Sequence, residues 1–513
     1  MDSRHRIWLL PLIVLALLSA GLYFYHYIPD DTFITLRYAR NVARGDGFVF
    51  NEGVRLEGYT NFLWLILLSS AARIGLPLLP TARALSLLFS LALLWATFAV
   101  SRDMARRRDL EGWEEGLASA LPPMLLAASP PYLAWSLSGT EIPLYALLLL
   151  AGFELLRRRR PLAAIFAAFG LLGLVRPEGL LFYALAGALL LARGEKRGAV
   201  IATGAAVLAL LYGPYLIWKW SYFGSLVPNT FYAKTGPLGL LIRNGARYVG
   251  GFITSYGYLA VLGLLLMKRV IPEEGPARLA LPFVLLHWAA LLLLGGDWMP
   301  HFRLLLPTLP LVLLILNEGL VLSILQGQIE RTETERGGTL PIVAMVLVLF
   351  VMFPGGLRYE RFENERFAVH LFSRLGKSLG MMLPPETSLG LGSTGAIGYY
   401  TDMEIVDILG LTEREIAREG RIVTTQPGHM KTDGARVLDR EPDLLLLGNI
   451  QVHRGRRGVD EMPLKVQEQD IARRPRFTRE YEFVNIPLGG HFYLSCFKRK
   501  DYFLPVAGGE PRR

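Results

Sequence analysis

The sequence contains one cysteine, Cys496, and few charged residues, which make up 19% of its 513 positions. A single cysteine excludes an intrachain disulfide and a metal site built from several thiolates. The low charge, with 52% hydrophobic residues and a mean hydropathy of +0.35, excludes an ordinary soluble enzyme. No set of His, Asp and Glu has strict metal-ligand spacing, so a divalent cation is possible but no motif requires it.

The hydrophobic residues are gathered into runs that suit membrane helices. PLIVLALLSAGLYFY (11–25) and LPIVAMVLVLFVMF (340–353) are near the length of a bilayer-spanning helix, about 20 residues. The runs predict a polytopic α-helical membrane protein with about 11–13 transmembrane helices. The candidate spans are 7–27, 61–76, 82–101, 117–130, 141–156, 162–175, 178–192, 198–219, 250–267, 279–295, 304–325 and 339–355.

The net charge of +10 comes largely from arginine clusters between the apolar runs, at 102–108, 157–160, 193–197, 268–278 and 331–336. Such clusters mark cytoplasmic loops of a membrane protein, and nucleic acid is not expected as a partner. This positive-inside rule predicts a cytoplasmic N-terminus and an extracytoplasmic C-terminus. It also requires an odd number of crossings between an outer loop at 31–60 and an inner loop at 102–116. The two spans predicted there give two crossings, so one of them is expected to be re-entrant or split, or a crossing is missing.

The composition changes at about residue 360, where the apolar runs shorten. SLGLGS, MEIVDILGL, DLLLLGNI and HFYLSCF predict strands of a small mixed α/β domain, with helices near 361–380 and 412–419. We therefore expect a transmembrane domain over 1–356, with its first outer loop at 28–60, and a soluble domain over 357–513. GLGSTGAIG (390–398) resembles a phosphate-binding glycine loop but lacks the Walker lysine, so a turn-rich strand connection is favoured.

Two adjacent carboxylates, Asp30 and Asp31, follow the first apolar run. One interpretation is that they cap a helix expected over 32–44 by accepting backbone N–H bonds. The other is that one of them is a general base at the membrane surface, taking a proton from an incoming hydroxyl. The two roles can coexist.

Further polar residues lie on the predicted outer loops. Glu57, Glu141 and Glu178 stand near the start of a span, where acidic residues are favourable in any case. Arg176 is a lone cation at the outer end of an apolar run, which by default indicates a functional role. PNTFYAKTG contributes Asn229, Tyr232 and Lys234, and GGDWMPHFR contributes Asp297, His301 and Arg303. Arg303 and His301 could bind a phosphate, although His301 is equally explained as an interfacial residue.

These segments together resemble the bacterial GT-C glycosyltransferases, polytopic enzymes that use polyprenyl-phosphate-linked sugars. The resemblance rests on residues 30–64, SGTEIPLYALLL, RPEG, PNTFYAK and GGDWMPHFR, and runs over most of 25–310. The nearest group is that of the mycobacterial terminal arabinofuranosyltransferases. The protein mannosyltransferases and the aminoarabinose transferase of lipid A are more distant. GAIGYY and DILGLTEREIA also resemble the tail of this group.

The resemblance implies a catalytic carboxylate in the first outer loop, which is Asp30 or Asp31; the sequence does not choose between them. It implies transfer of a sugar from a polyprenyl-phosphate donor to a hydroxyl of a cell-envelope glycan, lipid or protein, at the outer face of the bacterial inner membrane. By position and chemistry, binding of the donor phosphate or sugar is assigned to Arg176, Lys234, Asp297, His301 and Arg303. Positioning of the acceptor or the loops is assigned to Arg37, Glu57, Tyr59, Glu141, Glu178, Asn229 and Tyr232.

Two other functions compete with a transferase. A transporter of lipid-linked sugars would place ionisable groups near the middle of the membrane, whereas here they gather at one rim. A non-enzymatic scaffold or regulator would use the outer C-terminal domain as a binding module. The sequence leaves the sugar open, with arabinofuranose suggested by the nearest resemblance.

Overall fold

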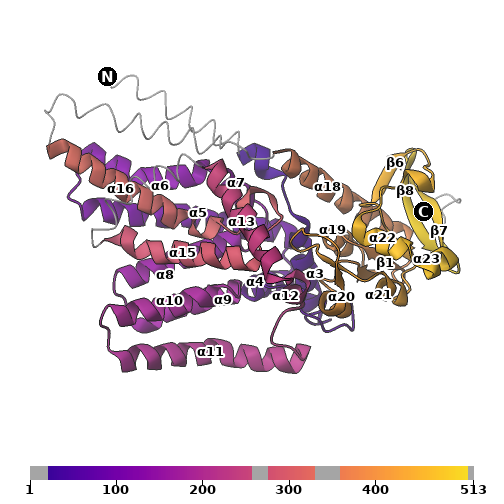
Figure 1. The fold of residues 1–513 in the computed structure, drawn as a ribbon, viewed down its shortest axis with the longest axis horizontal. Coiled ribbons are helices and arrows are strands. Elements are labelled where there is room, and N and C mark those ends of the chain that lie inside the picture. The colour runs from indigo at the N-terminus through magenta and orange to yellow at the C-terminus, as the bar shows by residue number, and fades with distance from the viewer. Residues whose placement is uncertain (1–20, 257–274, 330–358, 506–513) are drawn as a thin grey trace, which may run out of the picture.

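The computed structural model describes residues 21–256, 275–329 and 359–505. The predicted spans at 7–27 and 250–267 lie largely outside these residues, and the span at 339–355 lies wholly outside them. In Figure 1 the apolar helices lie side by side in an elongated bundle, and the C-terminal region is at one end of it.

The bundle is built from helices whose apolar residues occupy most of their surface. Three of the described helices are long and apolar enough to cross a membrane: α5 (Leu78–Arg106), α11 (Arg197–Phe223) and α15 (Pro276–Leu294). The other helices packed with them are α6 (Gly112–Ala128), α8 (Ile142–Arg157), α9 (Leu162–Val175), α10 (Gly179–Ala192) and α16 (Leu309–Ile329). The number of passes stays a prediction.

The predicted run at 61–76 does not cross the bundle, which agrees with the expectation that one of the two runs between 61 and 101 is re-entrant or split. It forms α4 (Phe62–Arg73), whose 12 residues extend only about 18 Å. Asn61, before α4, bonds to Glu141, and Arg83, in the second turn of α5, donates to the carbonyl of Leu137 (3.2 Å). Both ends of the segment are therefore at the same rim. Only α5 runs from this rim to the arginine cluster at 102–108, which agrees with the odd number of crossings that the predicted topology requires.

Further helices lie at the rim of the bundle from which α5 starts. They are α3 (Asp30–Arg44), α7 (Pro130–Ser136), α12 (Asn229–Lys234), the amphipathic α13 (Leu238–Ser255), and the single turns η1 (Pro300–Phe302) and η2 (Leu306–Thr308). The helix predicted at 32–44 is thus present as α3, beginning two residues earlier.

The C-terminal region combines α18 (Tyr359–Met382) with a mixed sheet of order β2-β1-β5-β8-β6, in which β7 also pairs with β8. β1 (Ser388–Leu391) is parallel to β2 (Glu404–Asp407) and β5 (Leu444–Leu445), and β5 is antiparallel to β8 (Phe492–Arg499). These four strands and the helices α18 and α20 (Arg414–Glu419) confirm the sequence-based prediction. Two further strands in this sheet, β6 (Gln451–Arg454) and β7 (Tyr481–Gly489), were not predicted. The remaining elements are α19 (Thr394–Tyr400), β3 (Arg421–Ile422), β4 (Lys431–Thr432), α21 (Gly434–Asp439), η4 (Val459–Glu461), α22 (Val466–Ala472) and α23 (Pro475–Glu480).

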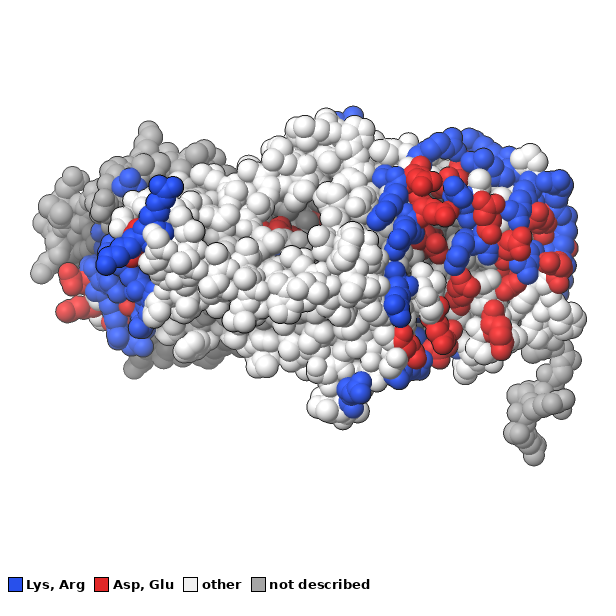
Figure 2. Space-filling view, turned by 90° about the horizontal axis from the view of Figure 1, so that it is seen from below, with Lys and Arg blue, Asp and Glu red and all other residues white. Residues whose placement is uncertain are grey.

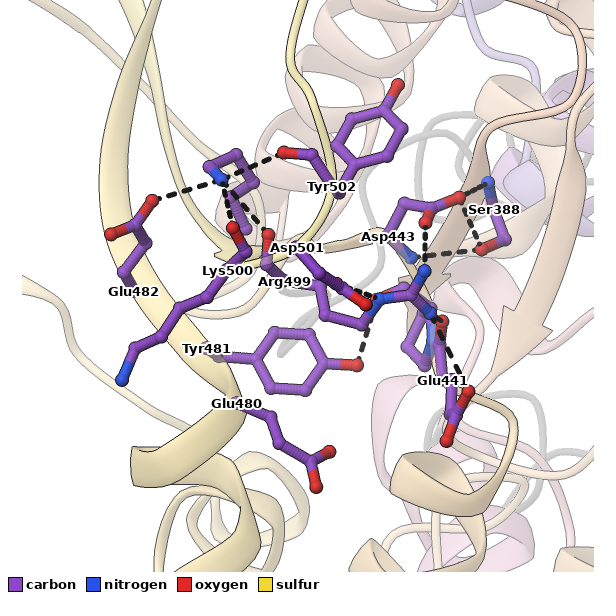
Figure 3. Close-up of polar contacts among 12 residues, drawn as sticks. Ser388, Glu441, Asp443, Glu480, Tyr481, Glu482, Arg499, Lys500, Asp501 and Tyr502 are labelled. Atoms are coloured by element: carbon purple, nitrogen blue, oxygen red, sulfur yellow. Dashed lines mark hydrogen bonds and ion pairs between the residues drawn. The ribbon is translucent and has the colours of Figure 1, made fainter.

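Polar contacts tie the last strand to the first one (Figure 3). Arg499, at the end of β8, pairs with Asp443 (3.0 Å), and Asp443 accepts the backbone N–H of Ser388 at the start of β1 (2.9 Å). Lys498 pairs with Glu482 across the β7–β8 ladder (3.0 Å). The contacts of Asp443 hold the end of β8 near the start of β1.

The loop over residues 28–60 is docked against this region. Arg37, buried on α3, donates to the carbonyl oxygens of Phe50 (2.7 Å), Gly398 (2.9 Å) and Met403 (2.8 Å). Asn51 bonds to the backbone of Ile405 as both donor and acceptor. Buried backbone groups require hydrogen-bond partners, and here the side chains of the loop supply them to the C-terminal region. These hydrogen bonds therefore fasten the loop to the C-terminal region.

Charged residues are unevenly distributed along the molecule. Figure 2 shows a basic group at one end, a wide uncharged band, and the mixed charges of the C-terminal region at the other end. A hollow opens within the uncharged band, and acidic side chains are visible at its base. The pattern is that of a bundle surrounded by lipid, with water at both ends.

Candidate active site

A cavity of about 640 Å³ lies where α3, the start of α4 and α12 meet. Its charged lining is Asp31, Glu141, Arg176, Lys234 and Arg303, which come from five separate segments of the chain. Tyr59, Trp64 and Asn61 complete one wall. Six of the residues assigned from sequence to a carboxylate or phosphate-binding role, or to positioning, are therefore brought into one space: Asp31, Tyr59, Glu141, Arg176, Lys234 and Arg303.

Asp31 is the carboxylate that faces this cavity. It lies in the first turn of α3 and pairs with Arg303 (3.2 Å), while its side chain stays 34% exposed. Burial would raise the pKa of Asp31, but the charges of Arg303 and Lys234 outweigh that effect and hold the pKa below its ordinary value. Asp31 is therefore ionised at neutral pH and can accept a proton.

Asp30 points the other way, into the C-terminal region. Its carboxylate accepts the backbone N–H groups of Gly395 (2.9 Å) and Ala396 (2.8 Å) in the first turn of α19. Burial raises the pKa of Asp30 to about 6, although these two hydrogen bonds oppose the rise. The N-cap of α3 itself is Pro29, and no side chain caps that helix. The prediction that the aspartates cap their own helix is therefore wrong; Asp30 instead serves the glycine-rich turn of residues 390–398.

Replacing Asp30 by alanine is expected to lower the free energy of unfolding by about 2 kcal/mol, because two buried N–H groups lose their acceptor. Thermal unfolding in detergent measures the loss, and hydrogen exchange over 394–400 locates it. Asp46→Ala, at an exposed acid of the same loop, is the matched control. Equal stability of the two variants would contradict the assigned role.

Arg303 is anchored behind Asp31 by a second carboxylate. Asp297 contacts the guanidinium with both oxygens, at Nε and at Nη2 (3.3 Å to the latter), and both side chains are less than a tenth exposed. Trp135 lies below, with its ring centroid 5.7 Å from the guanidinium carbon. Asp297 and Asp31 raise the pKa of Arg303 against the effect of burial, so the cation is permanent.

Arg176 forms a second anchored cation. It donates to Glu141 (2.8 Å) and to Glu178 (2.5 Å), which are the residues immediately before α8 and α10. Asn61 donates to the other oxygen of Glu141 (3.0 Å). The lone arginine and the two span-start glutamates noted in the sequence are therefore one hydrogen-bonded group.

Lys234 differs from the two arginines. It ends α12, its side chain is exposed, and it lines the cavity. Among the described residues no ion pair of Lys234 is found. Its ammonium group is thus available to an anion that enters the cavity.

The fold is matched by solved structures. ArnT from Cupriavidus metallidurans in the apo state aligns with a TM-score of 0.58 over 96% of this chain and 98% of that one, at 14% identity. The same protein bound to undecaprenyl phosphate aligns with a TM-score of 0.55 over 98% and 99%, at 13% identity. This chain has an ArnT-like GT-C fold. It is therefore a polytopic helical membrane protein with a C-terminal α/β region.

Sequence comparison finds curated relatives of the chain. It is 32% identical to a terminal beta-(1->2)-arabinofuranosyltransferase of Mycobacterium tuberculosis over 295 residues, which are 52% of this chain and 44% of that protein. A protein of the same name from Corynebacterium glutamicum is 30% identical over 346 residues, 58% of this chain and 50% of that protein. The chain thus spans about half the length of the curated relatives it matches. Residues 359–504 match a family described as a domain of unknown function (DUF8728).

Several residues assigned to positioning lie outside the cavity of this GT-C fold. Glu57 does not cap the next helix but forms a buried ion pair with Lys219 (2.8 Å). The amide of Asn229 donates to the carbonyls of Gly410 (2.9 Å) and Leu411 (3.0 Å), which fastens α12 to the C-terminal region. Tyr232 stacks under Arg418, 4.6 Å from its ring centroid. With Arg37, these residues hold the rim in place.

His301 is also separate from the Asp31 cavity. It lies on the wall of a second cavity, of about 1540 Å³, with Trp298, Arg247 and Arg361. The ring packs edge-on against Phe24, at a centroid distance of 5.2 Å, and the backbone φ is 54°. Burial lowers the pKa of His301 to about 3, so the imidazole is neutral and does not add charge toward a phosphate.

Two residues near the site had no signal in the sequence. Asn61 orients Glu141, as described above. Glu365, on α18, lies close to Tyr27, and both oxygens of the Glu365 carboxyl group are buried. Burial, helped by the charge of Asp31, raises the pKa of Glu365 to about 8. Neither residue belongs to a motif, and only the packing of distant segments reveals them.

No group of three or more His, Cys, Asp or Glu side chains in the described part of the chain is arranged to hold a metal ion. The acidic residues of the cavity are each engaged by an arginine instead.

Proposed function

We propose that this GT-C protein transfers a sugar from a polyprenyl-phosphate donor to a hydroxyl acceptor. The observation that carries the proposal is that an ionised carboxylate, Asp31, and three cations, Arg176, Lys234 and Arg303, line one cavity at the end of an apolar bundle. A lipid-linked sugar phosphate needs this combination, since its chain lies in the bilayer and its phosphate must be neutralised at the rim. The undecaprenyl phosphate named for the bound ArnT structure supports the class of donor.

In the proposed reaction, Asp31 takes the proton of the acceptor hydroxyl as its oxygen attacks the anomeric carbon. The bond from that carbon to the phosphate oxygen breaks, and its electron pair leaves with the polyprenyl phosphate. Lys234 and Arg303 face the charge that gathers on the phosphate, and Arg176 adds to the positive potential. The leaving group is already a stable anion, so it needs no proton.

The finer parts of the proposal rest on the relatives and on the charge distribution. The names of the curated relatives favour arabinofuranose as the sugar. As the acceptor we propose a hydroxyl of a cell-envelope glycan, lipid or protein. The basic end of the bundle is opposite the C-terminal region, which favours an extracytoplasmic site by the positive-inside rule. We further propose residues 1–356 as the transmembrane catalytic domain and 357–513 as a C-terminal soluble α/β domain that packs against it.

The test is sugar transfer by purified protein in lipid, with a panel of polyprenyl-phosphate sugars and, in parallel, nucleotide sugars. We expect turnover with one polyprenyl-phosphate donor and none with the nucleotide sugars. Turnover restricted to a nucleotide sugar would contradict the proposal. Absence of turnover with every donor, together with unchanged surface glycans in a deletion strain, would favour a scaffold.

The pH dependence of kcat/KM follows from the charges around Asp31. Because Arg303 and Lys234 hold the pKa of Asp31 below its ordinary value of 3.8, activity should be flat from neutral pH down to about pH 4. Lys234→Gln removes one of these cations and is expected to move the acidic limb upward by about half a unit to one unit. Lys196→Gln, at the opposite end of the bundle, should leave the limb where it is. An unmoved limb in Lys234→Gln would argue against Asp31 as the base.

A further inference from the structure

A cleft of about 1680 Å³ lies at the end of the bundle opposite the Asp31 cavity. It opens between the ends of α5, α8 and α10 and the start of α15. Its cationic lining consists of six arginines: Arg107, Arg108, Arg157, Arg159, Arg193 and Arg278. The basic side chains at one end of the molecule in Figure 2 belong to this end of the bundle.

Three of the six arginines are neutralised within the protein. Arg107 and Arg157 pair with Asp103 (2.9 and 2.5 Å), and Arg108 pairs with Glu318 (2.9 Å). Glu318 is the acid in the lining, and its second oxygen accepts the backbone N–H of Ala277 (2.7 Å). Glu318 is therefore fully engaged and cannot serve the remaining arginines.

The other three, Arg159, Arg193 and Arg278, are exposed and form no ion pair within the described ranges. Arg193 donates to the carbonyl of Leu156 (3.0 Å), which fixes its guanidinium at the cleft. Arg159 and Arg193 line the same cleft, and burial and the charge of Arg159 lower the pKa of Arg193, although Glu195 opposes the change. Such an arrangement is stabilised when an anion lies between the guanidinium groups.

The lining also contains apolar side chains, Met104, Leu189, Leu279 and Pro282, which are buried or half-buried, whereas the three arginines without an ion pair in the described ranges are exposed. Exposed cations beside buried hydrocarbon side chains match an anionic head group joined to acyl chains. A free phosphate would use the cations alone.

We infer that this cleft binds the phosphate group of an anionic membrane phospholipid, held by Arg159, Arg193 and Arg278. The bound lipid would join the ends of α8, α10 and α15 by neutralising their arginines, whose like charges otherwise repel one another. The site is separate from the proposed transferase cavity, and its test uses no sugar transfer.

The experiment measures lipid binding by native mass spectrometry and thermal unfolding of the full chain in a neutral detergent. Phosphatidylglycerol is compared with phosphatidylcholine, and inorganic phosphate and pyrophosphate form separate arms. The test variant is the triple Arg159→Gln, Arg193→Gln, Arg278→Gln. The matched control is Arg160→Gln, Lys196→Gln, Arg197→Gln, which removes the same charge from the same end outside the cleft.

We expect phosphatidylglycerol to bind and to raise the unfolding temperature of the wild type and the control, and to bind the test variant at least about ten-fold more weakly. Equal losses in the test and control variants would overturn the site in favour of general surface charge. Equal stabilisation by free phosphate would overturn the lipid assignment. If the triple variant does not fold, Arg278→Gln replaces it, and unchanged lipid affinity in that variant would overturn the proposal.

Discussion

Asp31→Asn is expected to abolish sugar transfer, with kcat lower by about 10²–10⁴-fold, while the protein stays folded. The amide keeps the size of the carboxylate but cannot take the acceptor proton. Stability should change little, because Asp31 is 34% exposed and Arg303 retains its contacts with Asp297. The measurement is single-turnover transfer with a saturating donor, alongside thermal unfolding in detergent.

The neighbouring residue provides the control. Asp30→Asn disturbs the start of α19 and is expected to lower stability, with transfer retained by the protein that remains folded. If Asp30→Asn lost transfer and Asp31→Asn kept it, the base would be Asp30, and our assignment of Asp31 would be wrong.

The second large effect is expected at Arg303. Replacing it by glutamine leaves the carboxylate of Asp297 buried without its cation, and such a loss costs about 3–5 kcal/mol. The free energy of unfolding should fall by that amount, and donor binding should fall with it. Thermal unfolding and equilibrium binding of a polyprenyl phosphate measure the two effects.

Two further variants separate stability from binding at this site. Asp297→Asn combined with Arg303→Gln removes the unpaired charge and should restore much of the stability but not donor binding. Lys234→Gln changes an exposed cation that has no ion pair in the described structure, so it should weaken donor binding at nearly unchanged stability. If Arg303→Gln were as stable as the wild type, the Asp297–Arg303 pair could not be the support described here.

The sequence predicted the features that depend on local pattern. The β1, β2, β5 and β8 strands follow from short apolar runs, and α18 and α20 lie where helices were expected. The fold class followed from hydropathy and from motif resemblance. The gathering of arginines at one end of the bundle was predicted from their clustering in the sequence.

The features that depend on distant contacts could not be predicted. Asp30 and Asp31 are consecutive in one helix, so their side chains point about 100° apart. Which of them faces the cavity is decided by the position of α19, more than 360 residues later in the chain. The failure of the 61–76 run to cross the bundle depends in the same way on Arg83 and Asn61 meeting partners at one rim.

Residues with ordinary sequence contexts gave no signal either. Glu57 and Lys219 are 162 positions apart and look unrelated until the loop packs on α11. His301 looks like a phosphate ligand beside Arg303, but its left-handed backbone turns it toward Phe24 and the second cavity. Proximity in sequence was misleading there because η1 is a tight turn.

The central claim is that the Asp31 cavity holds the donor phosphate. A structure of the protein with a polyprenyl phosphate bound tests it most directly. We expect the phosphate to lie in the cavity lined by Asp31, Lys234 and Arg303, with its oxygens facing the two cations. A phosphate bound instead in the second cavity, against Arg247 and Arg361, would contradict it.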